Sequence, residues 1–82
     1  MSLFLKIFEY DGTLIISEIE INEVTLRKSA ENKLYAGELI LIEGKHRQIE
    51  STSKVILDSH NKKWMMIRLK KHSYINFYES ID

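Results

Sequence analysis

Short stretches in which hydrophobic and polar residues alternate make up most of the chain, and turn residues separate them. Alternation with a period of two is typical of β-strands that bury one face. The first two stretches, Leu3–Tyr10 and Thr13–Ile21, are separated by Asp11-Gly12. An Asp-Gly pair between two apolar stretches is a strong hairpin signal. We therefore predict that the chain begins with an antiparallel β-hairpin.

The alternation also predicts which side chains of this hairpin face the core. In the first strand three aliphatic residues share one face: Leu3, Leu5 and Ile7. Three aromatic residues share the opposite face: Phe4, Phe8 and Tyr10. In the second strand we expect three isoleucines to point inward: Ile15, Ile19 and Ile21.

Further strands are predicted between residues 34 and 58. Leu34–Glu43 reads as a long strand that ends at a Gly44-Lys45 turn, and its apolar stretch Leu39–Ile42 favours an interior strand that is buried on both faces. Arg47–Asp58 alternates less regularly, with Ser51–Ser53 as a bulge or an exposed edge. Its predicted inward residues are Ile49, Val55 and Leu57.

The last part of the chain alternates most regularly. After a turn at Ser59–Lys62, the stretch Lys63–Lys70 is expected to form a strand with Met65, Ile67 and Leu69 inward. Its opposite face would carry Trp64, Met66, Arg68 and Lys70. A final short strand is predicted at Tyr74–Tyr78, followed by an acidic tail.

Residues 22–36 admit two interpretations. As a strand, the segment would place Val24 and Leu26 inward. As a helix, it would be capped by Asn22 and would align Leu26, Ala30 and Leu34 on one face. The β-branched residues in the segment disfavour the helix slightly, so we favour the strand.

Eighty-two residues make one domain, residues 1–82, and the strand count predicts an all-β fold. We expect a small antiparallel barrel or sandwich of six to seven short strands, with an up-and-down order as the simplest topology. The alternative is an α+β fold with one helix within residues 22–36. No signal peptide or membrane-spanning stretch is recognisable, so a cytoplasmic location and no membrane partner are expected.

Charge is distributed unevenly along the sequence. Residues 1–43 hold four Lys or Arg against eight Asp or Glu, and residues 44–82 hold eight against four, although the whole chain is neutral. Opposite charge on two surfaces can steer and align association, and a domain this small has a limited core. A protein partner, or a second copy in a homo-oligomer, is therefore the partner that we expect first.

Basic and aromatic residues are interleaved near the C-terminus. The candidate surface for nucleic acid or a protein partner comprises Lys62, Lys63, Trp64, Met66, Arg68, Lys70 and Lys71. Cations neutralise phosphates and aromatic rings stack on bases, which makes this pattern suitable for single-stranded nucleic acid. The simpler alternative is that Trp64 belongs to the core and the lysines only solvate an exposed hairpin.

The sequence offers little for catalysis or cofactors. It contains no cysteine, and its histidines, His46, His60 and His72, match no compact metal-ligand spacing. No serine lies in a Gly-x-Ser-x-Gly turn, and three scattered glycines make no phosphate-binding loop. We therefore predict no enzyme activity, catalytic residue, metal, cofactor or small-molecule ligand.

These observations lead to two hypotheses on function. The first is a non-enzymatic small interaction protein that self-associates. The chain is rich in isoleucine and poor in alanine, which is typical of a low-GC bacterium or one of its phages, so we expect a gene carried by a phage or another mobile element. The second is a single-stranded nucleic-acid-binding β-domain that uses the basic and aromatic residues 60–78.

Overall fold

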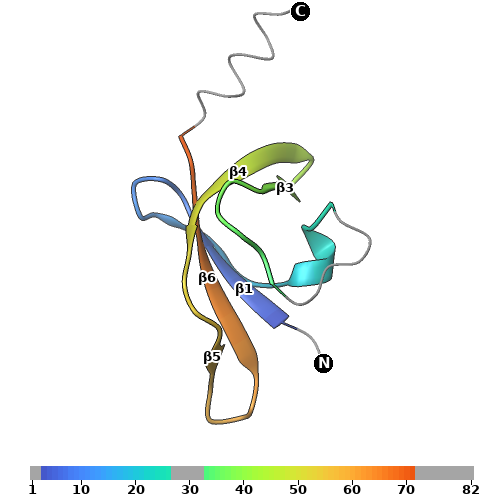
Figure 1. Ribbon diagram of the computed structural model, residues 1–82, viewed down its shortest axis with the longest axis vertical. Helices are drawn as coiled ribbons and strands as arrows, with labels where there is room; N and C mark the ends of the chain where they lie inside the picture. The colour runs from blue at the N-terminus through green and yellow to red at the C-terminus, as the bar shows by residue number, and fades with distance from the viewer. Residues whose placement is uncertain (1–2, 27–32, 72–82) are drawn as a thin grey trace, which may run out of the picture.

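The computed structural model describes residues 3–26 and 33–71, which form one curled, mixed β-sheet with the shape of a half-barrel (Figure 1). Its strands are β1 (Leu3–Phe8), β2 (Leu14–Glu20), β3 (Leu39–Ile42), β4 (Lys45–Thr52), β5 (Ile56–Leu57) and β6 (Lys63–Leu69). One 3-10 turn, η1 (Ile21–Glu23), follows β2, and the described residues contain no α-helix. The prediction of a small all-β fold is confirmed.

The strands are ordered β2-β1-β6-β4-β3, and β5 pairs with β6. All pairs are antiparallel except β1 with β6, which run parallel in register from Leu3 beside Lys63 to Phe8 beside Arg68. The expectation of a purely antiparallel, up-and-down sheet is therefore wrong at its centre. Parallel strands need a long connection, and residues 9–62 provide one that spans most of the domain.

The core lies on the concave side of the half-barrel. The alternation predicted for β1 and β6 is confirmed, because the inward side chains of both strands are fully buried: Leu3, Leu5, Ile7, Met65, Ile67 and Leu69. Six further residues complete the core: Ile21, Val24, Leu34, Ile40, Ile42 and Ile49. Side chains at the even-numbered positions of β1 and β6 consequently lie on the opposite face.

The first hairpin forms as predicted, but strict alternation fails in β2. Leu5 pairs with Ile19 and Ile7 pairs with Ile16, so three residues of β2 are matched to two of β1. Such a β-bulge changes which side chains face inward. Ile16 and Ile19 therefore pack against the core while Ile15 is 41% exposed, which corrects the prediction that Ile15 points inward.

The β3–β4 hairpin is tight, and β3 is shorter than predicted. Glu43 and Gly44 both have positive φ, which is typical of a two-residue type I′ turn. β3 is the last strand of the sheet rather than an interior strand, and residues 24 and 25 cover part of its outer edge. Thr25 bridges to Ile40, and the Leu41 N–H donates to the Val24 carbonyl at 2.8 Å. β3 is therefore apolar although it is the last strand of the sheet, and residues 24 and 25 cover part of its outer edge.

Neither interpretation of residues 22–36 holds as stated. The chain forms the short 3-10 turn η1 where the helix was predicted to begin. Val24 is buried, as the strand interpretation predicted. Leu26 is 48% exposed, which disagrees with both interpretations. Residues 27–32 lie outside the described residues, as does the predicted strand Tyr74–Tyr78.

Of the two alternatives predicted at Ser51–Ser53, a bulge or an exposed edge, the structure has a register shift just before this segment, between Ile49 and Ser51. Beyond this shift the chain reaches β5, where Val55 and Leu57 are 43% and 58% exposed. Their prediction as inward residues is wrong, because β5 is a short edge strand and the bulge interrupts the alternation of β4.

Candidate binding surface

The central strands carry aromatic and basic side chains on their convex side. Parallel pairing places Phe4 beside Trp64, Lys6 beside Met66 and Phe8 beside Arg68. The neighbouring odd-numbered residues of both strands are buried, so these six side chains share one surface, which we call the outer face. The outer face thus comprises Phe4, Lys6, Phe8, Trp64, Met66 and Arg68.

Trp64 lies on the outer face and is half-buried, so it is not a core residue. Its ring centroid is 5.8 Å from that of Phe4, with the two planes tilted by 45°. Its indole N–H donates a hydrogen bond of 3.0 Å to Asp58 Oδ2. Two contacts therefore fix the orientation of the ring while leaving part of its surface accessible.

Two lysines lie over this aromatic pair. Lys6 Nζ is 4.8 Å from the Trp64 ring centroid, and Lys62 Nζ is 4.8 Å from the same ring and 4.2 Å from that of Phe4. Lys62 also forms a 2.9 Å salt bridge with Glu18 of β2. A cation above an aromatic face is attracted by the ring quadrupole, so this end of the outer face has both ring surface and positive charge.

The β5–β6 turn is ordered by one carboxylate. Asp58 Oδ1 accepts hydrogen bonds from the backbone N–H groups of His60 at 2.8 Å and Lys62 at 2.9 Å, while Oδ2 accepts the Trp64 indole N–H. These bonds, the Lys62 backbone first, lower the pKa of Asp58 below its ordinary value. The turn therefore positions both Lys62 and Trp64.

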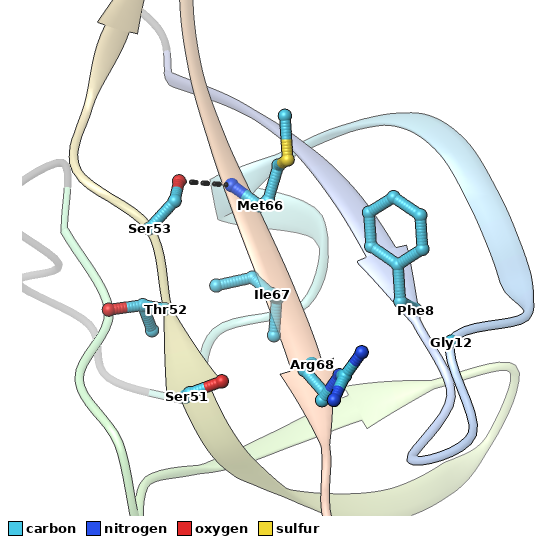
Figure 2. Close-up of a pocket in the computed structure, with 8 residues that line it drawn as sticks. All are labelled: Phe8, Gly12, Ser51, Thr52, Ser53, Met66, Ile67 and Arg68. Carbon is cyan, nitrogen blue, oxygen red and sulfur yellow. Dashed lines mark hydrogen bonds between the residues drawn. The ribbon is translucent and has the colours of Figure 1, made fainter.

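The other end of the outer face is hollowed. An open groove of about 420 Å³ is lined by Phe8, Gly12, Ser51, Thr52, Ser53, Met66, Ile67 and Arg68 (Figure 2). Ser53 Oγ accepts the Met66 backbone N–H at 2.8 Å and donates to the Lys54 carbonyl, so it is engaged in the sheet. Arg68 lies between β1 and β4 and extends toward the β1–β2 turn at Gly12.

The predicted surface residues do not all share this face. Lys62, Trp64, Met66 and Arg68 gather along it. Lys63 pairs with Leu3 and has the same parity as the buried Met65, so it belongs to the other side of the strand. Lys70 and Lys71 follow β6, and Lys71 Nζ lies 5.7 Å from the Tyr10 ring.

Three residues of the outer face were not predicted: Phe4, Lys6 and Phe8. The sequence did place Phe4 and Phe8 on one face of the first strand. What it did not reveal was the parallel pairing of β1 with β6, which joins that face to the basic and aromatic C-terminal strand.

A buried ion pair between Arg47 and Glu9 lies at the end of the sheet where β1 and β6 end. Arg47 donates from Nη1 to Glu9 Oε2 at 3.0 Å and from Nη2 to Glu9 Oε1 at 2.6 Å, and Nη2 also reaches the Lys70 carbonyl. The Arg47 side chain is 7% exposed. This bidentate pair links the end of β1 to β4 and the residue after β6, and alternation alone did not predict a buried arginine.

The described residues contain no group of three His, Cys, Asp or Glu side chains that could hold a metal ion. They also contain no helix long and apolar enough to cross a membrane. Comparison of the chain with protein-family models, with curated proteins and with solved structures finds no match.

Proposed function

We propose that the protein is a non-enzymatic binding protein whose outer face binds single-stranded nucleic acid. The observation that carries this proposal is the alternation of aromatic and basic side chains across the parallel pair of β1 and β6. Phe4, Phe8 and Trp64 offer ring surface, and Lys6, Lys62 and Arg68 offer positive charge beside it. Sheet surfaces with such aromatics are a common means of binding unpaired bases.

The spacing of the aromatic residues suits more than one base. Phe4 and Phe8 are four positions apart on β1, which corresponds to roughly 13 Å along a strand. Each stacked base contributes about 1–3 kcal/mol. Lys6 and Lys62, which lie over Trp64 and Phe4, would move toward the phosphates when a base takes their place on the rings.

Acidic residues at the rim limit the affinity expected. Glu18 pairs with Lys62, Asp58 holds Trp64, and the chain as a whole is neutral. Since phosphate contacts provide most non-specific affinity, we expect modest binding that weakens steeply with salt.

Fluorescence anisotropy with labelled dT and rU 15-mers at low salt tests this proposal. We expect binding that Trp64→Leu weakens roughly tenfold, in line with the loss of one stacking contact. Tyr35→Leu is the matched control, because Tyr35 is an exposed aromatic in the turn before β3. Circular dichroism verifies that both variants fold. No binding of either oligonucleotide at low salt would contradict the proposal.

Self-association is a second candidate, and a separate observation favours it. Val55, Ile56 and Leu57 are consecutive, apolar and 43–58% exposed, and β5 has β6 as its one strand partner among the described residues. Exposed apolar edge strands are templates for pairing with another chain. At the opposite end of the sheet the edge strand β2 carries Glu18 and Glu20, whereas Lys54 adjoins β5.

A second copy of this chain is the occupant that these edges suit, with the acidic β2 edge of one copy against the β5 edge of another. Sedimentation equilibrium from low to high micromolar concentration tests this candidate. We expect weak association that Leu57→Lys abolishes and that Val55→Thr, a milder change at the same edge, reduces. A monomer throughout this concentration range would remove the candidate without affecting the nucleic-acid proposal.

A further inference from the structure

Arg68 is one of the basic residues of the outer face. Within the part of the chain that the structure describes, no hydrogen bond or salt bridge engages its guanidinium, whereas Lys62 pairs with Glu18 and Lys6 donates to the Ser17 carbonyl. Arg68 is exposed and lines the open groove on the outer face. A guanidinium presents several donors in a rigid plane that matches a phosphate.

The neighbours of Arg68 are arranged in a row across three strands. Phe8 of β1 is its register partner on one side, and Ser51 of β4 is its partner on the other. Figure 2 shows the Ser51 hydroxyl directed toward β6 and the Phe8 ring on the other side of the same strand. The three residues therefore occupy one register row of the sheet, in which the Phe8 ring extends toward Met66 and the Arg68 side chain toward Gly12.

We propose that this row is a nucleotide subsite, in which Arg68 and Ser51 bind a backbone phosphate and the Phe8 ring stacks on the adjoining base. The inference rests on the proposed binding of single-stranded nucleic acid and assigns the phosphate contact within it. The guanidinium supplies charge and two parallel donors, and the serine hydroxyl supplies a third donor. The groove of about 420 Å³ is large enough for one nucleotide unit.

The β1–β2 turn bounds this subsite with an acidic residue. Asp11 Oδ1 accepts the Thr13 backbone N–H at 3.0 Å, which holds the carboxylate in the turn. Arg68 is near enough to act on that carboxylate electrostatically, although no hydrogen bond joins them. A phosphate on Arg68 would compete with this attraction and be repelled by Asp11, so removal of the Asp11 charge should strengthen binding.

The experiment measures the affinity of the full-length protein for a labelled dT 15-mer as a function of salt. Arg68→Gln should weaken binding five- to twentyfold at low salt, and should reduce the slope of log K against log salt by about 0.7, the value for one phosphate contact on a single strand. Arg68→Lys should keep the slope and lose part of the affinity, because it keeps the charge without the planar donor pair. Asp11→Asn, whose amide oxygen can still accept the Thr13 N–H, should raise the affinity.

Lys45→Gln is the matched control, since it removes one exposed cation from the β3–β4 hairpin and leaves the outer face intact. Each variant is first compared with the wild type by circular dichroism and urea unfolding. If the wild type binds and Arg68→Gln changes affinity and slope no more than Lys45→Gln, the subsite is wrong while the proposed function stands. If the wild type does not bind the oligonucleotide, or an acidic peptide such as a Glu heptamer binds with equal affinity, the proposed function and the subsite both fail.

Discussion

The central strands β1 and β6 follow the sequence pattern of hydrophobic and polar residues more closely than the edge strands β2 and β5 do. In β1 every second residue from Leu3 and in β6 every second residue from Met65 is fully buried, and the register between the strands runs without a shift. In β2 the register with β1 shifts twice, and β5 is only two residues long with both side chains exposed. Both regions are rich in aliphatic residues, so hydrophobicity alone does not separate them.

The two groups of strands differ in their number of strand neighbours. β1 lies between β2 and β6, and β6 lies between β1 and the β4–β5 side, so hydrogen bonds on both sides fix each residue on one face. β2 and β5 each have one strand partner among the described residues, and an edge strand can absorb an extra residue in a bulge. In β1 and β6, regular alternation accompanies pairing on both sides, whereas β4, which also lies between two strands, carries a register shift between Ile49 and Ser51.

The largest expected effect is a difference in stability between two variants, each of which truncates one isoleucine, one in β6 and one in β2. Ile67 of β6 is fully buried, so Ile67→Ala should lower the free energy of unfolding by about 2–5 kcal/mol. Ile15 of β2 is 41% exposed, so Ile15→Ala should lower it by about 1 kcal/mol or less. Urea unfolding followed by circular dichroism measures both.

The same chemical change at two isoleucines makes each variant a control for the other. Equal losses of stability would mean that β2 lacks the bulge and that Ile15 faces the core after all. In that case the contrast between centre and edge would be wrong, whatever the effect at Ile67.

Much of the fold was predictable because short-range signals determine it. Asp11-Gly12 marks the turn of the first hairpin, the predicted Gly44-Lys45 turn lies one residue after the observed turn at Glu43-Gly44, and the inward residues of β1 and β6 follow from alternation. The bulges were not predictable in the same way, apart from the one at Ser51–Ser53, because the isoleucines of β2 suit either face. Burial of Ile16 rather than Ile15 depends on pairing with β1, which alternation does not encode.

Only half of the candidate site, the part on β6, could be predicted from the sequence. Trp64, Met66 and Arg68 could be assigned to one face of a strand from their spacing. Their neighbours Phe4, Lys6 and Phe8 come from a strand about sixty residues earlier, and parallel pairing between the first and last described strands is a long-range contact. Local patterns carry no information on such a contact, so the complete outer face became visible only in the fold.

A second contrast is between a salt bridge that is buried and one that is exposed. Arg47 and Glu9 have side chains that are 7% and 20% exposed, whereas Lys62 and Glu18 are 31% and 50% exposed. Glu9→Gln should lower the free energy of unfolding by roughly 2–3 kcal/mol, because it removes the charge of a carboxylate that accepts two hydrogen bonds from a buried guanidinium. Glu18→Gln makes the same change at the exposed pair and should cost less than about 1 kcal/mol.

Urea unfolding of these two variants, together with Arg47→Met and the double variant Arg47→Met/Glu9→Gln, measures the coupling. The double variant should be more stable than the sum of the two single losses implies, since it removes both charges together. Additive losses would show that Arg47 and Glu9 act separately rather than as one buried pair.

The smallest expected effect is a local change in the β5–β6 turn when Asp58 is protonated at low pH. The pKa of Asp58 lies below its ordinary value of 3.8, chiefly because its carboxylate accepts the Lys62 backbone N–H and then the Trp64 indole N–H. A lowered pKa in the folded state means that the ionised carboxylate stabilises the turn, fully so above the ordinary value. That contribution is lost as the pH falls through the folded-state pKa.

Trp64 fluorescence measures this transition, because the indole N–H loses a charged acceptor when Asp58 is protonated. We expect a change in emission with a midpoint below pH 3.8 that is absent in Asp58→Asn. Asp11→Asn is the matched control, because the pKa of Asp11 is also lowered but its carboxylate accepts the Thr13 N–H at the other end of the outer face. Asp11→Asn should keep the transition, and persistence of the transition in Asp58→Asn would mean that Trp64 reports global acid unfolding rather than the β5–β6 turn.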